Sequence, residues 1–188
     1  EELPIYEGTL APWKDAVVLA ARTLRRYGIH KATTVVIAAD GSDNIWRETD
    51  NLLTLAGIDP AKVVRLVDFS HAVGHLSDAA KLSSRFTCDE QREQWVKKQK
   101  ARLKRGRVER LLADMEALPT EGEEAARGLE RECGYFRSRL SLMRYDRFRE
   151  QGLPIGTGAV ESAIRRIVNL RLKSPGTFWK PENAERML

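Results

Sequence analysis

Residues 33–71 read TTVVIAADGSDNIWRETDNLLTLAGIDPAKVVRLVDFSH, with a short apolar run near each end. Residues 33–39 and 63–69 are rich in β-branched side chains and bounded by turn residues, which is typical of buried strands. Between them, residues 44–56 repeat apolar positions at helical spacing, and another helical pattern follows the second run. Because strands and helices alternate within so short a segment, the sequence predicts an α/β fold.

Each apolar run closes on an aspartate, Asp40 for the first and Asp68 for the second. Ligand sites of open α/β sheets gather at the carboxyl ends of the strands, so these two residues are candidates for a site. Asp40 also fits an ordinary Asp-Gly turn, and Asp68 also fits a charge at the start of the next helix. His71 follows Asp68 by three residues, and a hydrogen bond from His71 to Asp68 would orient the site.

Residues 77–151 show no strand pattern and contain three helical patterns in succession. We therefore expect an all-helical segment between the second strand and a closing helix. Trp95 lies in the first of these helices, among basic residues, and fits either the core or a contact with nucleic acid.

The segment GLPIGTGAVESAIRRIVNLRLKSPGTFW, residues 152–179, joins a Gly/Pro-rich turn to a helical pattern. Glu161 falls in the first turn of that helix, where the helix dipole favours a carboxylate. It fits a metal ligand, a capping residue or an i,i+4 partner of Arg165. The remaining surface of this helix is basic.

The composition describes a globular chain with an anionic partner. Of its 188 residues 42% are hydrophobic and 31% are charged, and no apolar run approaches the roughly 18 residues of a membrane span. The two cysteines form no CxxC pattern, and no signal peptide is visible, so we expect reduced thiols in a cytoplasmic protein. The net charge of +5 favours nucleic acid as the partner.

Basic residues concentrate in two tracts, which are the candidate DNA-binding residues. The first comprises Lys97, Lys98, Lys100, Arg102, Lys104 and Arg105, and the second comprises Arg165, Arg166, Arg171 and Lys173.

Acidic residues at the ends of several elements are typical of phosphoryl transfer on nucleic acid. Such sites commonly hold two divalent ions about 4 Å apart between carboxylates that converge from different elements. Mg²⁺ and Mn²⁺ are hard ions that prefer these oxygen ligands. The sequence therefore indicates a Mg²⁺ or Mn²⁺ site.

Several motifs, in their order along the chain, resemble those of bacterial insertion-sequence transposases of the DDE type, related to the Mutator-like superfamily. These are ADGSDNIW (39–46), LVDFSH (66–71), GLPIGTGAVESA (152–163), RLK (171–173) and a Gly-x-x-Trp (176–179). The resemblance implies an RNase H-like catalytic core, formed by residues 1–76 and 152–188. It also implies that residues 77–151 are a helical insertion before the last acidic helix.

The resemblance also implies roles for the acidic residues. Asp40 would be the second catalytic acid and Glu161 the third, and both would be metal ligands, with two ions in the complete site. Asp68 and His71 would form the family's Asp-x-x-His element between them. The first catalytic aspartate would lie on an earlier strand, but Asp15, the sole earlier aspartate, lies in a helical pattern. We therefore expect a portion of the catalytic domain that is inactive alone.

By this resemblance, a metal-bound water would cleave DNA at the ends of the element, and the released 3′-hydroxyl would attack target DNA. The partners would be double-stranded DNA, both element ends and target, and further copies of the chain. The protein would be associated with the nucleoid and not with a membrane. The alternatives are a non-catalytic DNA-binding module, a decayed transposase remnant, and a helical interaction protein without a nucleic-acid role.

Overall fold

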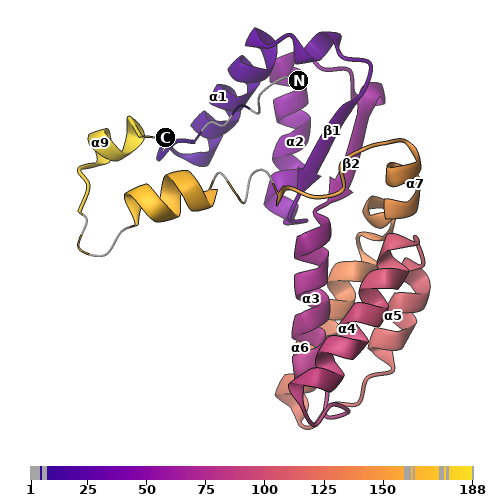
Figure 1. The fold of residues 1–188 in the computed structure, drawn as a ribbon. Coiled ribbons are helices and arrows are strands. Elements are labelled where there is room, and N and C mark those ends of the chain that lie inside the picture. The colour runs from indigo at the N-terminus through magenta and orange to yellow at the C-terminus, as the bar shows by residue number, and fades with distance from the viewer. Residues whose placement is uncertain are drawn as a thin grey trace. The chain divides into compact units, whose positions relative to one another are not determined.

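The computed structural model describes residues 5, 8–158, 162, 164–173, 176 and 178–187. Figure 1 shows helices as the dominant elements of this part of the chain. The longer elements are α1 (Trp13–Arg26), β1 (Val35–Ala39), α2 (Asp43–Ala56), β2 (Val63–Val67), α3 (Phe69–Leu82), α4 (Asp89–Lys104), α5 (Val108–Glu116), α6 (Glu123–Arg137), α7 (Tyr145–Glu150) and α9 (Pro181–Glu185). The short 3₁₀ helices are η1 (Ile29–Lys31), η2 (Pro60–Lys62) and η3 (Leu140–Met143), and η4 (Ile164–Leu172) is π-helical.

The predicted α/β fold with an RNase H-like core is wrong for the described residues. Their sheet consists of two parallel strands, β1 and β2, and the other regular elements are helices. The two apolar runs do form strands, but the remaining apolar residues recur at helical spacing. Their side chains are therefore buried between helices, and the result is a mostly helical fold with one small sheet.

The described chain divides into two compact units. The first unit contains Glu1–Val35, Ser42–Val64 and Thr157–Leu188, and the second contains Val36–Gly41 and Arg65–Gly156. The predicted division into a core (1–76 and 152–188) and a helical insertion (77–151) stays a prediction, because these two units do not test it.

The second unit is a helical bundle joined to the ends of both strands. Helix α3 packs against α4 and α6, and α5 packs against the same two helices, as Figure 1 shows. Tyr145 connects the bundle to β2: its hydroxyl donates to the carbonyl oxygen of Val67 at 2.9 Å, and its ring meets Phe69 edge-on at 5.1 Å. The fully buried core includes Leu66, Val67, Leu76, Leu103, Leu111, Met115, Phe136, Met143 and Tyr145.

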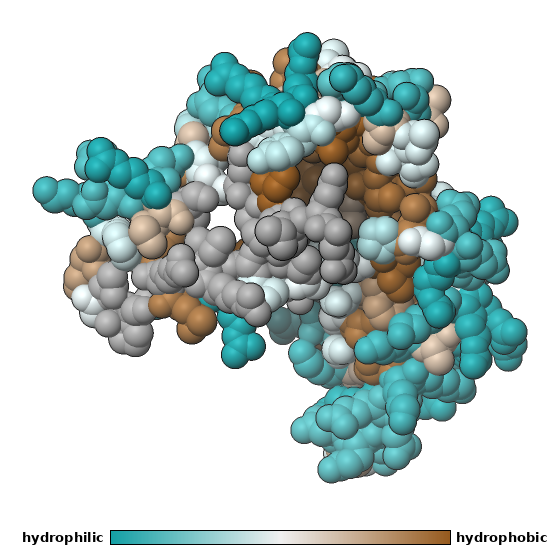
Figure 2. All heavy atoms as spheres, turned by 45° about the horizontal axis from the view of Figure 1, so that its top comes forward, coloured by the Kyte–Doolittle hydropathy of each residue, from teal (hydrophilic) through white to brown (hydrophobic). Residues whose placement is uncertain are grey.

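Trp95 belongs to this core. From the sequence it fitted either the core or a contact with nucleic acid. Its side chain is only 8% exposed, and its ring lies 5.8 Å from that of Phe86. Figure 2 shows mainly hydrophilic residues over the visible face of the bundle. The apolar side of α4 is therefore turned inward, and its basic residues form the surface.

The first unit is built on the pairing of α1 with α2. Residues near the two chain termini also meet in this unit. The Glu185 carboxylate accepts hydrogen bonds from the Thr9 hydroxyl at 2.5 Å and the Leu10 amide at 2.6 Å. The exposed large apolar side chains of the described residues all belong to this unit, among them Trp13 and Phe178. Within the described residues, none of the helices combines the length and apolar character that crossing a membrane requires.

Candidate functional site

Asp40 and Asp68 lie at the same edge of the sheet. Each directly follows the last residue of its strand, and the strands are parallel neighbours. The Asp68 amide donates to the carbonyl oxygen of Ala39 at 2.7 Å, so the pairing of the two strands continues to their ends. The carboxyl ends of β1 and β2 therefore bring the two predicted site residues together, both within the second unit.

Asp68 is the N-cap of α3. Its Oδ1 accepts a hydrogen bond from the backbone amide of His71 at 2.8 Å, and the residue is only 3% exposed. This bond comes from the backbone of His71 and not from its imidazole, so it matches the alternative interpretation of Asp68 as a charge at the helix start. A buried carboxylate held at a helix start is stabilised by the amide and by the helix dipole.

Two side chains of the α6 segment hold the turn that follows β1. The Tyr135 hydroxyl donates to the carbonyl oxygen of Asp40 at 2.8 Å, and Arg139 Nε donates to that of Gly41 at 2.7 Å. Gly41 has a φ of +93°, and a Cβ there would lie 3.0 Å from the Tyr135 hydroxyl and 3.1 Å from Arg139 Nε. Glycine is therefore required here by both backbone conformation and space.

The Tyr135 ring is itself packed between polar groups. The His75 ring stacks on it at 3.6 Å, and the Arg139 guanidinium lies 4.7 Å from its centroid. His75 Nδ1 pairs with Glu132 Oε2 at 2.6 Å. The exposed His71 ring meets His75 edge-on at 5.1 Å, so the two histidines share one face of α3.

Burial chiefly raises the pKa of Tyr135. The guanidinium of Arg139 opposes that shift, and the carboxylates of Asp40 and Asp68 add to it. The Tyr135 hydroxyl is therefore a protonated donor at neutral pH.

Tyr135 and Arg139 were not predicted from the sequence. They lie 95 and 98 residues along the chain from the carbonyl groups that they bind. Their one sequence signal is an i,i+4 pair of polar side chains on an otherwise amphipathic helix, which does not indicate a partner.

Glu161, the predicted third acid, lies outside the described residues. The segment that leads to it lies directly against Asp68. The carbonyl oxygen of Ile155 accepts a hydrogen bond from the Phe69 amide at 3.0 Å, and a Cβ on Gly156 would lie 3.5 Å from Asp68 Oδ2.

The acidic pair offers oxygen ligands of the kind that Mg²⁺ and Mn²⁺ prefer. Among the described residues, however, His, Cys, Asp and Glu form no group of three or more that could hold a metal ion. Asp40 and Asp68 thus fit part of a metal site, and the predicted two-ion site needs a further ligand. Glu161 as that ligand stays a prediction.

The first basic tract lies on α4 and divides into two kinds of residue. Lys97, Lys98, Lys100, Lys104 and Arg105 are exposed. Arg102 is paired with Asp114 of α5 and donates to the buried side chain of Gln99, which gives it a structural role.

Two of these lysines lie close to the acidic pair. The ammonium groups of Lys100 and Lys104 are 6.0 and 5.4 Å from the ring centroid of Phe69, the residue after Asp68. Positive charge on α4 therefore borders the strand ends. In the second tract, Arg165 and Lys173 are exposed, whereas the side chains of Arg166 and Arg171 are outside the described part.

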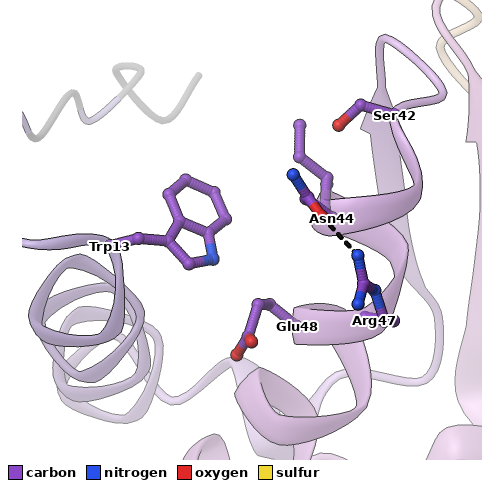
Figure 3. A pocket seen from close by; sticks show the side chains of 6 residues that line it. Trp13, Ser42, Asn44, Arg47 and Glu48 are labelled. Carbon is purple, nitrogen blue, oxygen red and sulfur yellow. Dashed lines mark hydrogen bonds between the residues drawn. The ribbon is translucent and has the colours of Figure 1, made fainter.

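A separate hollow of about 530 Å³ lies in the first unit. Figure 3 shows the Trp13 indole facing the first turns of α2, where Arg47 donates to Asn44 at 2.5 Å. Its lining includes a single carboxylate, that of Glu48. One carboxylate does not fit a two-ion site, so the strand ends remain the candidate metal centre.

No protein-family model, curated protein or solved structure matches the chain. The likeness to transposases therefore rests on the sequence motifs. The strand-end geometry is an independent observation beside them.

Proposed function

We propose that the chain carries part of a metal-dependent phosphoryl-transfer site that acts on DNA, as in the DDE transposases that it resembles. The observation that carries this proposal is the convergence of Asp40 and Asp68 at the ends of neighbouring parallel strands, where the Asp68 amide binds the Ala39 carbonyl oxygen at 2.7 Å. Carboxylates that converge from different elements are the usual ligands for the ions of such sites.

In this proposal Asp40 and Glu161 are metal ligands, and Asp68 fixes the edge of the site from the N-cap of α3. The role of Glu161 in this proposal comes from the resemblance of its motif, and Gly156, five residues before it in the sequence, lies against Asp68. A bound Mg²⁺ would supply an activated water and neutralise the charge that develops on the phosphate.

Lysines of α4 would hold the DNA backbone. Lys97, Lys100 and Lys104 recur at i, i+3 and i+7, so they share one side of the helix. Lys97 and Lys100 line a hollow of about 450 Å³ between α3 and α4, and Lys100 and Lys104 lie beside Phe69. Phosphates bound along this lysine row would lead toward the strand-end aspartates.

Cleavage of DNA tests the proposal. The substrate is a supercoiled plasmid that carries the DNA flanking the coding sequence, with Mg²⁺ or Mn²⁺ added. The protein assayed is the chain extended by upstream coding sequence that supplies the first catalytic aspartate. We expect ion-dependent cleavage that Asp40→Asn and Glu161→Gln reduce by at least about a hundredfold. Asp15→Asn, a change of an exposed aspartate in α1, is the matched control. Undiminished cleavage by Glu161→Gln would contradict the assignment.

A non-catalytic DNA-binding module is the second candidate. The exposed lysines of α4 favour it. It predicts binding that weakens steeply with salt, without cleavage in Mg²⁺ or Mn²⁺. Failure to bind DNA even at low salt would instead favour a helical interaction protein.

A further inference from the structure

We infer that Tyr135 and Arg139 are positioning residues for Asp40. They bind the backbone of the Asp40–Gly41 turn from the α6 side and thereby set the direction in which the Asp40 carboxylate leaves the strand. This inference rests on the proposed function, because it has a meaning for catalysis only if Asp40 is a metal ligand.

The geometry of the two hydrogen bonds carries the inference. They reach successive carbonyl oxygens, that of Asp40 from the Tyr135 hydroxyl at 2.8 Å and that of Gly41 from Arg139 Nε at 2.7 Å. With both carbonyl groups held, the peptide between them has little freedom to rotate. The Cα–Cβ bond of Asp40 is then fixed relative to α6.

The turn needs such support because β1 ends at Ala39. The ladder that holds the strand therefore stops one residue before Asp40. Gly41 is also the last residue of the second unit before the chain enters the first. The hydrogen bonds from Tyr135 and Arg139 thus hold the backbone where β1 ends and the loop to α2 begins.

The two donors are themselves held in place. His75 stacks on the Tyr135 ring at 3.6 Å and is paired with Glu132 at 2.6 Å, and the Arg139 guanidinium lies 4.7 Å from the same ring. Residues 132, 135 and 139 lie on one face of α6 and its C-terminal extension by helical spacing. An ordered row of side chains therefore supports each hydrogen bond, as in the outer shells of metal sites.

Calorimetric titration with Mn²⁺ tests the inference on the intact chain. We expect Tyr135→Phe and Arg139→Gln each to weaken Mn²⁺ binding by about tenfold, as loss of a residue that orients a ligand commonly does. Arg139→Lys, which keeps a cationic donor, should recover part of the affinity. A merely structural role would not produce this rescue. Thermal unfolding of each variant confirms that the titration was made on folded protein.

Arg137→Gln is the matched control for Arg139, since Arg137 is the last residue of α6, two positions earlier, but pairs with Glu116 and Glu130. Its Mn²⁺ affinity should equal that of the wild type. Wild-type affinity in both Tyr135→Phe and Arg139→Gln, with binding lost in Asp40→Asn, would overturn the inference and leave the proposed function standing. Binding that Asp40→Asn does not change would overturn both.

Discussion

Gly41 lies between the strand end that carries Asp40 and two side chains from the α6 segment. Its φ of +93° is unfavourable for any residue with a Cβ, and the Tyr135 hydroxyl and Arg139 Nε would crowd a methyl group at 3.0 and 3.1 Å. At the scale of single residues, the candidate site thus depends on glycine at position 41 as well as on its charged side chains.

Replacing Gly41 tests this dependence. Gly41→Ala should destabilise the protein by about 2 kcal/mol, because it combines backbone strain with a contact near 3.0 Å. Gly74→Ala is the control: Gly74 lies within α3, a methyl group added there would meet nothing within 4 Å, and alanine favours the helix. Urea denaturation should therefore show a lower free energy of unfolding for Gly41→Ala and no decrease for Gly74→Ala. Equal stability of the two would refute the crowding at Gly41.

At the scale of elements, α4 combines a structural and a binding role. Its inner side carries Trp95, Gln99 and Leu103, which are buried, and its outer side carries lysines. Arg102 links α4 to α5 through Asp114. Burial raises the pKa of Asp114, but hydrogen bonds from Arg102 and Gln99 outweigh it, and the net pKa is lowered.

The pair between Arg102 and Asp114 should therefore stabilise the fold in a pH-dependent way. Because the pKa of Asp114 is lower in the folded state, its contribution is present above the unfolded pKa and is lost as pH falls through the folded one. Asp114→Asn should be less stable than the wild type at pH 7, by no more than about 1 kcal/mol because the site is partly exposed. The difference should shrink below about pH 4. A constant difference from pH 7 to pH 3 would contradict this account.

The lysine row on the other side of α4 should act on DNA and not on stability. Lys100→Ala combined with Lys104→Ala should reduce the salt dependence of DNA binding by about two units of slope, since each lysine releases about one counterion. Lys14 and Lys31, exposed and outside both basic tracts, provide a matched double variant. Fluorescence anisotropy across a salt series measures both slopes. If the salt dependence of DNA binding is unchanged in the α4 double variant, these lysines do not contact DNA.

For the whole molecule, the sequence predicted local elements well and the fold class poorly. β1, β2 and α3 formed where periodicity and turn residues indicated them, and parallel pairing brought Asp40 and Asp68 to one edge. The fold class was wrong because two short strands were extrapolated to a larger sheet. Periodicity reports which residues are buried, but it does not tell whether a helix packs on a sheet or on other helices.

The contacts of the site show the same limit. The donors from the α6 segment reach carbonyl groups that any residue supplies, so residues 40 and 41 carry no sequence signal for Tyr135 or Arg139. The sequence indicated that His71 could orient Asp68, but the donor is the backbone amide of His71, as the helix-start interpretation of Asp68 implies. The motifs therefore indicated the acidic residues and not the groups that hold them.

The central proposal is that Asp40 and Glu161 are ligands of a divalent ion and that Asp68 lies beside it. Fe²⁺ bound in place of Mg²⁺ reduces added hydrogen peroxide to hydroxyl radicals, and ascorbate regenerates the Fe²⁺. The radicals cut the backbone next to the bound ion, and mass spectrometry locates the cuts. The account predicts cuts near residues 40, 68 and 161, which excess Mg²⁺ suppresses and Asp40→Asn abolishes. Cuts confined to other parts of the chain, or a pattern that Asp40→Asn leaves unchanged, would contradict it.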